Sequence, residues 1–386
     1  MTDNYRKYLK YKQKYVDLKK KLDMRSGNSA ETLNKINTII EKYQEQINKI
    51  NTDKPPQADL NKCNTFANLI TNLNQYAVAP SASVFNRLNT LSDTTNVKEF
   101  AKEMGLNDHA ESLQKLLDTY FSKNEIVKYH TKAHAFNTCY AAKVLWEQWI
   151  EPKFPPGTSD PLLTKAKKIC LLAAFAHDVY HDGSTNPTYC ARCTANKTGI
   201  KNSCKIWTNC GKSQPYMEEI QAIKAFEIIK DDPLFLNNDK AKEIFIEAIN
   251  HTWMFNHNKE MAEIPEDLTQ INSENIRDII QYIVHAADLI GQALPLKLSE
   301  KLGRLIDHEL KIANNKFDNE IAENDEPSFQ KSQIGFLIFF KYIEFWFRLI
   351  RFFDKQYAQN LSHELMYNIV TNSKSYLSSE CKTLYI

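Results

Sequence analysis

Apolar residues recur along most of this chain at the i, i+3 and i+4 spacing that marks one face of an α-helix. The chain has only nine glycines in 386 residues, which is few for an architecture that joins many strands and helices through tight turns. Its 42% hydrophobic and 11% aromatic content is enough to build a sizeable core. The sequence therefore predicts an all-α globular protein and argues against a Rossmann fold or a barrel.

Charge and hydropathy argue against several other classes of protein. The net charge of +2 and the pI near 8.0 give no broad attraction to nucleic acid, so no clear nucleic-acid site is expected. No apolar segment like a cleavable signal follows the first residue. The most apolar run, 336–353, carries four charged residues that would be costly in lipid, Lys341, Glu344, Arg348 and Arg351. We therefore expect that run to form a core helix and not to span a membrane. We also expect a cytoplasmic protein, whose eight cysteines are free thiols or metal ligands rather than a disulfide framework.

Residues 1–54 differ from the rest because they contain two amphipathic runs with heptad-like spacing. The apolar positions are Tyr8, Tyr11, Tyr15, Leu18 and Leu22 in the first run, which is basic, and Leu33, Ile36, Ile40, Tyr43, Ile47 and Ile50 in the second. Pro55-Pro56 ends the second run. The runs predict either a helical hairpin or a coiled coil through which the chain would form a homo-oligomer, or helices packed on the chain's own core. A second region, 57–386, follows.

Histidines and aspartates form an ordered series on apolar segments farther along: His130 and His134, then His177-Asp178, then Asp288. Residues four apart share a helix face, so His130 and His134 are expected to point the same way. One histidine in an apolar helix is usually a hydrogen-bonded core residue, but the whole ordered series is not expected by chance. Imidazole nitrogen and carboxylate oxygen suit Zn, Mn, Fe or Mg. The series predicts two metal ions bridged by Asp178, with a shared hydroxide as nucleophile near neutral pH.

The same series resembles the HD superfamily of metal-dependent phosphohydrolases, and further segments narrow the resemblance to the class I cyclic nucleotide phosphodiesterases. Those segments are Tyr129-His130-Thr131, the box from His177 to Asn186, Glu218 to Phe226, Thr252-Trp253-Met254 with His257, and Ile283 to Leu289. Ser332-Gln333-Ile334-Gly335-Phe336 matches the family's purine-site Ser-Gln-x-Gly-Phe. The resemblance covers about 125–353 and implies an all-helical catalytic core, so 57–386 would be the catalytic domain.

The resemblance also implies roles for individual residues. The tighter metal, usually zinc, would be held by His134, His177, Asp178 and Asp288, and Asp178 would also reach a second ion, magnesium or manganese. His130 would be the general acid that protonates the leaving 3′ oxygen. Metal-bound water would be oriented by His181, Glu218 and Thr252. Substrate contacts would come from Tyr129, from Gln333 at the base edge and from Phe336 on the base face.

Four positions depart from the family's pattern without removing a direct metal ligand: Thr131, Tyr180, Asp182 and Trp253. Gly291 stands where adenine-selective members carry Asn, so base selectivity stays open. The leading hypothesis is metal-dependent hydrolysis of a 3′,5′-cyclic nucleotide, cAMP or cGMP, to the 5′-nucleotide. The alternatives are an HD phosphohydrolase acting on cyclic dinucleotides or nucleoside monophosphates, and a weakly active protein that sequesters a cyclic nucleotide.

A cysteine-rich insertion, 188–213, follows the second metal box and contains Cys190, Cys193, Cys204 and Cys210. Four thiolates in a polar segment can close a tetrahedral, structural zinc site. The other interpretation is a surface loop with free thiols, or with a disulfide formed after lysis. Finally, the segment from Tyr8 to Tyr15 resembles one common in proteins of giant DNA viruses, which would place the protein in host cytoplasm or in the virion.

Overall fold

The computed structural model describes residues 29–50, 57–123, 127–154, 161–181, 183, 217–252, 264, 265, 268, 271–313, 326–339, 341–377, 381 and 382. Within these ranges the named elements are all helices, and β-structure is limited to an isolated bridge between Phe121 and Thr131. The prediction of an all-α fold is therefore confirmed. Short 3₁₀-helices link or extend the α-helices: η1 (Asn74–Tyr76), η2 (Asn86–Thr90), η3 (Asn107–His109), η4 (Glu151–Lys153) and η5 (Leu289–Ala293).

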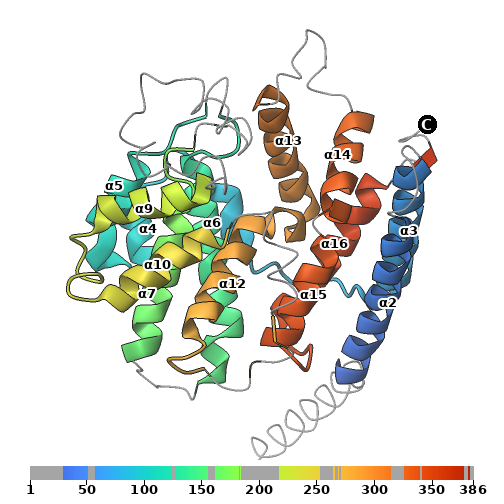
Figure 1. The fold of residues 1–386 in the computed structure, drawn as a ribbon, viewed down its shortest axis with the longest axis horizontal. Coiled ribbons are helices and arrows are strands. Elements are labelled where there is room, and N and C mark those ends of the chain that lie inside the picture. Colours follow the sequence, from blue (N-terminus) through green and yellow to red (C-terminus); the bar gives the residue numbers. More distant parts are fainter. Residues whose placement is uncertain are drawn as a thin grey trace, which may run out of the picture.

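Helices from the middle of the chain form one side of the molecule (Figure 1). They are α4 (Val97–Met104), α5 (Ala110–Leu117), α6 (Lys132–Trp149), α7 (Pro161–Ala176), α9 (Met217–Ile229), α10 (Asp239–Asn250) and α12 (Ile276–Asp288). Helix α7 packs against α6, α10 and α12, and every residue from Ile169 to Ala176 is buried. A helix that is apolar on all sides belongs at the centre of a fold. The end of α7 is therefore enclosed by its neighbours.

The other side is built from α13 (Leu296–Ala313), α14 (Glu326–Phe339), α15 (Tyr342–Phe353) and α16 (Asn360–Tyr376) (Figure 1). The apolar run 336–353 is divided between α14 and α15 at Lys341, whose φ of 46° lies in the left-handed region. Helix α15 is a core helix, as predicted, because its aromatic side chains are all buried and Glu344 pairs with Arg348 at 2.9 Å.

No single helix in the described part of the chain has the length and apolarity needed to cross a membrane. This length and apolarity are reached only by two consecutive segments taken together, Ile276–Ala293 and Leu296–Lys311, and the chain bends by 105° between them.

Helices α2 (Ser29–Ile50) and α3 (Gln57–Leu73) lie together along the C-terminal helices (Figure 1). Helix α2 is the second amphipathic run of the sequence, and it contacts α3 and α15. Its buried residues are those of the predicted stripe, Leu33, Ile36, Ile40, Tyr43 and Ile47, which pack on the chain's own core. The first run, including the segment from Tyr8 to Tyr15, lies outside the described residues. A hairpin or coiled coil, and the boundary at 54, stay predictions.

A disulfide joins Cys63 in α3 to Cys381, with the two Cα atoms 5.7 Å apart. The expectation of free thiols or metal ligands is wrong for this pair. The two cysteines are 318 positions apart, and the packing of α3 on α16 brings them together, so no local spacing indicates the bond. Cys139 and Cys170 are buried free thiols. The four cysteines of the insertion lie outside the described residues.

A buried polar cluster joins the start of α5 to the turn after α9. Asp232 Oδ1 lies 2.8 Å from His109 Nδ1, and Asp232 Oδ2 accepts a hydrogen bond of 2.5 Å from Ser112. Burial alone would raise the pKa of Asp232, but the hydrogen bonds from His109 and Ser112 outweigh it and lower the pKa below its ordinary value. The carboxylate therefore stays ionised and fixes the two segments to each other.

Candidate metal centre and active site

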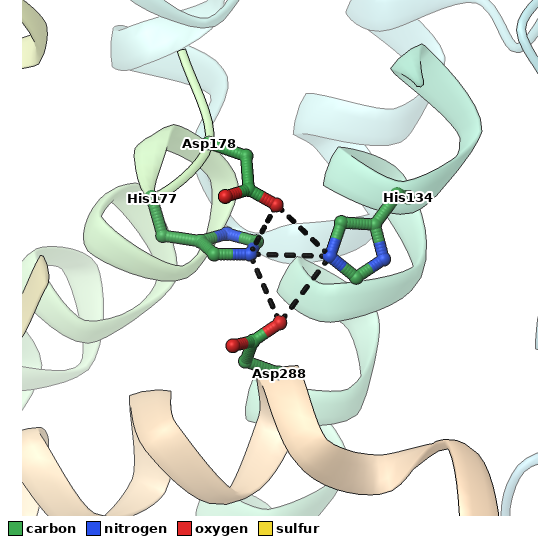
Figure 2. A group of neighbouring side chains, drawn as sticks. All are labelled: His134, His177, Asp178 and Asp288. Carbon is green, nitrogen blue, oxygen red and sulfur yellow. Dashed lines mark hydrogen bonds and ion pairs between the residues drawn. The ribbon is translucent and has the colours of Figure 1, made fainter. Parts of the chain in front are cut away.

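The four predicted metal ligands converge from three helices (Figure 2). His134 lies in the first turn of α6, His177 and Asp178 directly follow α7, and Asp288 is the last residue of α12. These helices pack pairwise against one another, which fixes the positions of all four side chains. The turn after α7 is held by Tyr120, whose hydroxyl donates to Phe175 O at 2.8 Å and accepts from Asp178 N at 3.1 Å.

The ligand atoms form a compact group whose members lie within 4.8 Å of one another. His177 Nε2 lies 2.9 Å from Asp178 Oδ2 and 3.1 Å from Asp288 Oδ1, while His134 Nε2 lies 3.3 Å from each of these oxygens. The two Nε2 atoms are 3.1 Å apart. Two imidazole nitrogens and two carboxylate oxygens are a ligand set that suits zinc and related divalent ions.

The hydrogen bonds around this group fit a metal ion. His177 Nδ1 lies 2.9 Å from the carbonyl oxygen of Ala174, to which it donates, and this leaves the Nε2 lone pair directed at the centre. Asp178 Oδ2 is buried, receives no backbone or hydroxyl donor in the described chain, and has the Nε2 atoms of His177 and His134 as its polar neighbours. The residues present therefore fit a bound divalent ion.

Electrostatics keep the two carboxylate ligands in the charge state that a metal requires. Burial would raise the pKa of Asp178, but the imidazoles of His177 and His130 outweigh it and hold the pKa well below its ordinary value. For Asp288, burial is likewise outweighed by His177, and the pKa is lowered. Burial would lower the pKa of His177, whereas the two carboxylates raise it well above its ordinary value, so a metal ion that binds there would displace a proton from Nε2. Both carboxylates are thus ionised, as metal binding demands.

His130 stands beside the metal group rather than in it. Its Nε2 lies 3.9 Å from Asp178 Oδ2, while its Nδ1 is hydrogen-bonded to Glu309 Oε1. The other oxygen of Glu309 accepts backbone N–H bonds of 2.7 Å from both Lys128 and Tyr129. Burial would lower the pKa of His130, but Glu309 and Asp178 raise it to about 9, and His130 in turn holds the pKa of the buried Glu309 at about 2. This ion pair aims Nε2 of His130 at the metal group.

Glu309, the buried partner of His130, was not among the residues predicted from the sequence. A signal was present, because it continues the 4, 3, 4 spacing of Leu298, Leu302 and Leu305 along the core-facing side of α13. A carboxylate at such a position must be paired when it is buried.

His181 extends the arrangement by stacking on His130, with ring centroids 3.7 Å apart and planes inclined by 17°. Together with Glu309 these two histidines form a second group of metal-type ligands. Its hydrogen bonds favour a different role, because His181 Nδ1 accepts from Gly183 N at 3.1 Å and the ring proton then lies on Nε2. His181 is therefore arranged as a hydrogen-bond donor.

The other residues predicted to lie near the metal group have different local environments. Thr252, which is buried just beyond α10, donates its hydroxyl proton to Ile249 O at 2.8 Å and keeps its lone pairs free to accept from water. The Tyr129 ring packs 4.4 Å from the His134 ring. Glu218 lies in the first turn of α9 and is partly buried. Neither Trp253 nor His257 is among the described residues.

Gln333 is buried in α14, and its side-chain oxygen accepts a hydrogen bond from Gln292. Gln292 lies in η5, the segment that directly follows Asp288, one of the four predicted metal ligands. Its own side-chain oxygen accepts from Ser299 Oγ at 3.2 Å, and Ser299 Oγ lies 3.0 Å from the Tyr376 hydroxyl. A buried chain of hydrogen bonds thus fixes the Gln333 amide beside the helix that ends in Asp288.

Phe336 lies three residues after Gln333 in α14 and is partly buried. Its ring centroid is 5.7 Å from that of Tyr342, whose hydroxyl donates to Leu289 O. Because Leu289 is the residue after Asp288, both predicted base contacts are tied to the segment that follows the metal ligand.

A family model described as 3′5′-cyclic nucleotide phosphodiesterase matches residues 129–363, which is more than half of the chain. The chain belongs to this family. It is a cyclic nucleotide phosphodiesterase, and the family's dependence on metal agrees with the group formed by the two histidines and two aspartates.

Solved structures show that this phosphodiesterase also shares its fold with known domains. The phosphodiesterase domain of the RhoPDE fusion protein from the choanoflagellate Salpingoeca rosetta superposes with a TM-score of 0.55 at 17% identity, covering 79% of this chain and 95% of that one. The phosphodiesterase domain of Salpingoeca rosetta rhodopsin phosphodiesterase gives 0.55 at 18% identity, covering 79% and 91%. No curated protein matches the sequence.

One departure of this phosphodiesterase from the family's pattern is visible beside the ligands. Tyr180, two residues after Asp178, is 48% exposed and has a φ of 60°, in the left-handed region that a bulky residue rarely adopts. The ammonium group of Lys224 in α9 lies 5.0 Å above its ring. An aromatic ring and a cation therefore lie two residues along the chain from Asp178, at a position that departs from the family's pattern.

Proposed function

We propose that this phosphodiesterase hydrolyses a 3′,5′-cyclic nucleotide, cAMP or cGMP, to the 5′-nucleotide with two divalent ions and His130 as general acid. The observation that carries the proposal is the convergence of four metal-type ligands beside a histidine that is paired through Nδ1 with a buried carboxylate. When bound, the ions would supply Lewis acidity and a hydroxide nucleophile at neutral pH.

The chain's own residues would divide the work around that centre. His134, His177, Asp178 and Asp288 would hold the tighter ion, for which zinc is proposed, and Asp178 would also face the second, magnesium or manganese. His130 would carry its proton on Nε2 toward the leaving 3′ oxygen, since Glu309 keeps the ring charged and oriented. His181, Glu218 and Thr252 would orient water around the ions.

The base would be recognised at α14. An amide side chain carries both a donor and an acceptor and can read a purine edge. Because the oxygen of Gln333 already accepts from Gln292, its NH₂ group is the part left for the base. Phe336, on the same face three residues later, would cover the ring, and Tyr129 would complete the substrate contacts.

The test is turnover of a substrate panel with Zn plus Mg or Mn: cAMP, cGMP, cyclic dinucleotides and nucleoside monophosphates, with products resolved by chromatography. We expect conversion of cAMP or cGMP to the 5′-monophosphate. Asp178→Asn should abolish it, whereas Asp59→Asn, an exposed aspartate of α3, should leave it unchanged. Failure to convert either mononucleotide would contradict the proposal.

The general-acid role has its own test. His130→Ala should lower kcat by about 10²- to 10⁴-fold, the usual contribution of a positioned general acid, while leaving the bound metal in place. Metal content measured by atomic spectrometry separates the outcomes. Loss of metal together with activity would mean that His130 is a ligand rather than the acid.

The exposed ring of Tyr180 under Lys224 favours one alternative, a cyclic dinucleotide, because a second base and a second phosphate could bind an aromatic face and a cation close in the chain to Asp178. Preferential turnover of cyclic dinucleotides in the same panel would support this substrate class. Tight binding of a cyclic nucleotide without turnover would instead support sequestration.

A further inference from the structure

A buried glycine, Gly303, lies in the interior of α13 opposite Gln333. Glycine is among the least favourable residues inside a helix because its backbone loses the most freedom on folding. Gly303 does not adopt a left-handed conformation, so the backbone does not require glycine there. The reason must lie in the space around it.

The missing side chain makes room for the Gln333 amide. A Cβ atom at position 303 would lie 3.0 Å from Gln333 Oε1 and 3.3 Å from Gln333 Cδ, both closer than ordinary van der Waals contact. It would also meet the Phe329 ring at 3.4 Å. The side chain that would have to move is therefore that of Gln333.

Neither neighbour can yield freely. Gln333 is 3% exposed, and the oxygen nearest position 303 is the one that accepts from Gln292. Phe329 is buried as well, with the guanidinium of Arg304 4.2 Å from its ring centroid and the Tyr376 ring edge-on at 5.8 Å. A methyl group at 303 would thus have to displace the Gln333 amide, whose oxygen Gln292 holds, by a few tenths of an ångström.

We infer that Gly303 is a specificity-determining position of this phosphodiesterase, because the absence of a side chain there lets Gln333 lie against α13 in the orientation that Gln292 holds. This inference rests on the proposed function, in which the Gln333 amide reads the base. Gly303 touches no substrate in this account; it acts by positioning Gln333.

The test compares wild type with Gly303→Ala for cAMP, cGMP and the pyrimidine substrate cyclic CMP. Alanine is a better helix former than glycine, so the variant should fold and keep its metal. We expect KM for the preferred purine substrate to rise about tenfold, because the loss of one well-placed hydrogen bond weakens binding by about that factor. The value of kcat should change less than about twofold. The preference over cyclic CMP should shrink in proportion. Lys301→Ala, at an exposed site of α13, is the matched control and should change neither constant.

A double-mutant cycle isolates the Gln333 contact. In a Gln333→Ala background the obstructing amide is gone, so adding Gly303→Ala should leave KM and the purine preference unchanged. Two results would overturn the inference. In the first, Gly303→Ala raises KM equally in the wild-type and Gln333→Ala backgrounds. In the second, Gly303→Ala leaves KM unchanged in the wild-type background although Gln333→Ala raises it. If the Gly303→Ala single variant does not fold, the inference requires that the double variant with Gln333→Ala does fold. If neither variant folds, the inference is overturned as well. Absence of turnover and binding in wild type would instead refute the proposed function, and this inference with it.

Discussion

Replacing Glu309 with glutamine removes one negative charge and little else. Glu309 is buried on α13, where one oxygen is hydrogen-bonded to His130 Nδ1 and the other accepts the backbone N–H groups of Lys128 and Tyr129. Glutamine has nearly the same shape, and its side-chain oxygen can still accept from the backbone. The variant should therefore fold, retain the metal ligands and change chiefly the charge state of His130.

The expected loss of rate follows from that charge state. Burial lowers the pKa of His130, while Glu309 and Asp178 raise it to about 9, so the wild-type ring is protonated at pH 7.5. Without the carboxylate the pKa should fall to its ordinary value of about 6.5 or below, and roughly one ring in ten keeps its proton at pH 7.5. Lost orientation of the ring should cost about a further 10- to 100-fold. We expect kcat to fall about 10²- to 10³-fold with little change in KM.

The assay is the pH profile of kcat for the preferred cyclic nucleotide across the neutral and alkaline range. A general acid must be protonated to act, so wild-type kcat falls as pH rises through the pKa of His130. In Glu309→Gln that descending limb should move to lower pH, whereas Glu99→Gln, an exposed carboxylate of α4, should leave it in place. Adding Glu309→Gln to His130→Ala should cause no further loss. An unshifted limb, or loss of bound metal, would refute the reasoning.

Three further perturbations test the fold and the metal. Cys63→Ser should lower the free energy of unfolding by about 3 to 5 kcal/mol, because the bond to Cys381 closes a loop of 318 positions, and reductant should then have no added effect on the melting temperature. Asp232→Asn should destabilise by about 2 kcal/mol near neutral pH. The pKa of Asp232 is lower in the folded protein than in the unfolded chain. The difference in free energy of unfolding between wild type and variant should therefore be complete above about pH 4 and decrease as pH falls through the folded pKa. Melting temperatures measured at a series of acid pH values would show this decrease. Chelation should abolish turnover and lower the melting temperature, and turnover that persists would contradict a metal mechanism.

The helical fold was predicted from a pattern that a single sequence records. The four ligand positions were predicted from the ordered histidines and aspartates together with the family resemblance, and the structure brings these four side chains together. Apolar spacing reports the buried face of a helix directly. The adjacent pair His177-Asp178 and the isolated His134 and Asp288 stand on apolar segments, and an apolar segment tends to be buried. Polar side chains on three buried helices must be hydrogen-bonded, paired with opposite charges or bound to a metal ion, because an unpaired polar group is costly in a protein interior.

The residues that the sequence did not reveal depend on packing between distant elements. Glu309 is one of 47 acidic residues, and although its spacing places it on the core-facing side of α13, only the structure shows that it pairs with His130. The role inferred for Gly303 can be recognised only from the structure, in which Gln333 of α14 lies against it. The disulfide between Cys63 and Cys381 depends on how α3 packs on α16, which no local spacing records.

The spacing between the metal group and the base contacts is fixed by the backbone. Asp288 ends α12, and η5 carries the chain on to Gln292, which holds Gln333. A 3₁₀-helix rises about 2 Å per residue, so the ligand and the residue that holds the amide lie about 8 Å apart along the chain. One ribose ring separates the phosphate of a nucleotide from its base, a span of the same order. Side-chain changes such as Gly303→Ala or Glu309→Gln should therefore alter base preference or proton transfer separately, because neither changes the distance that η5 sets.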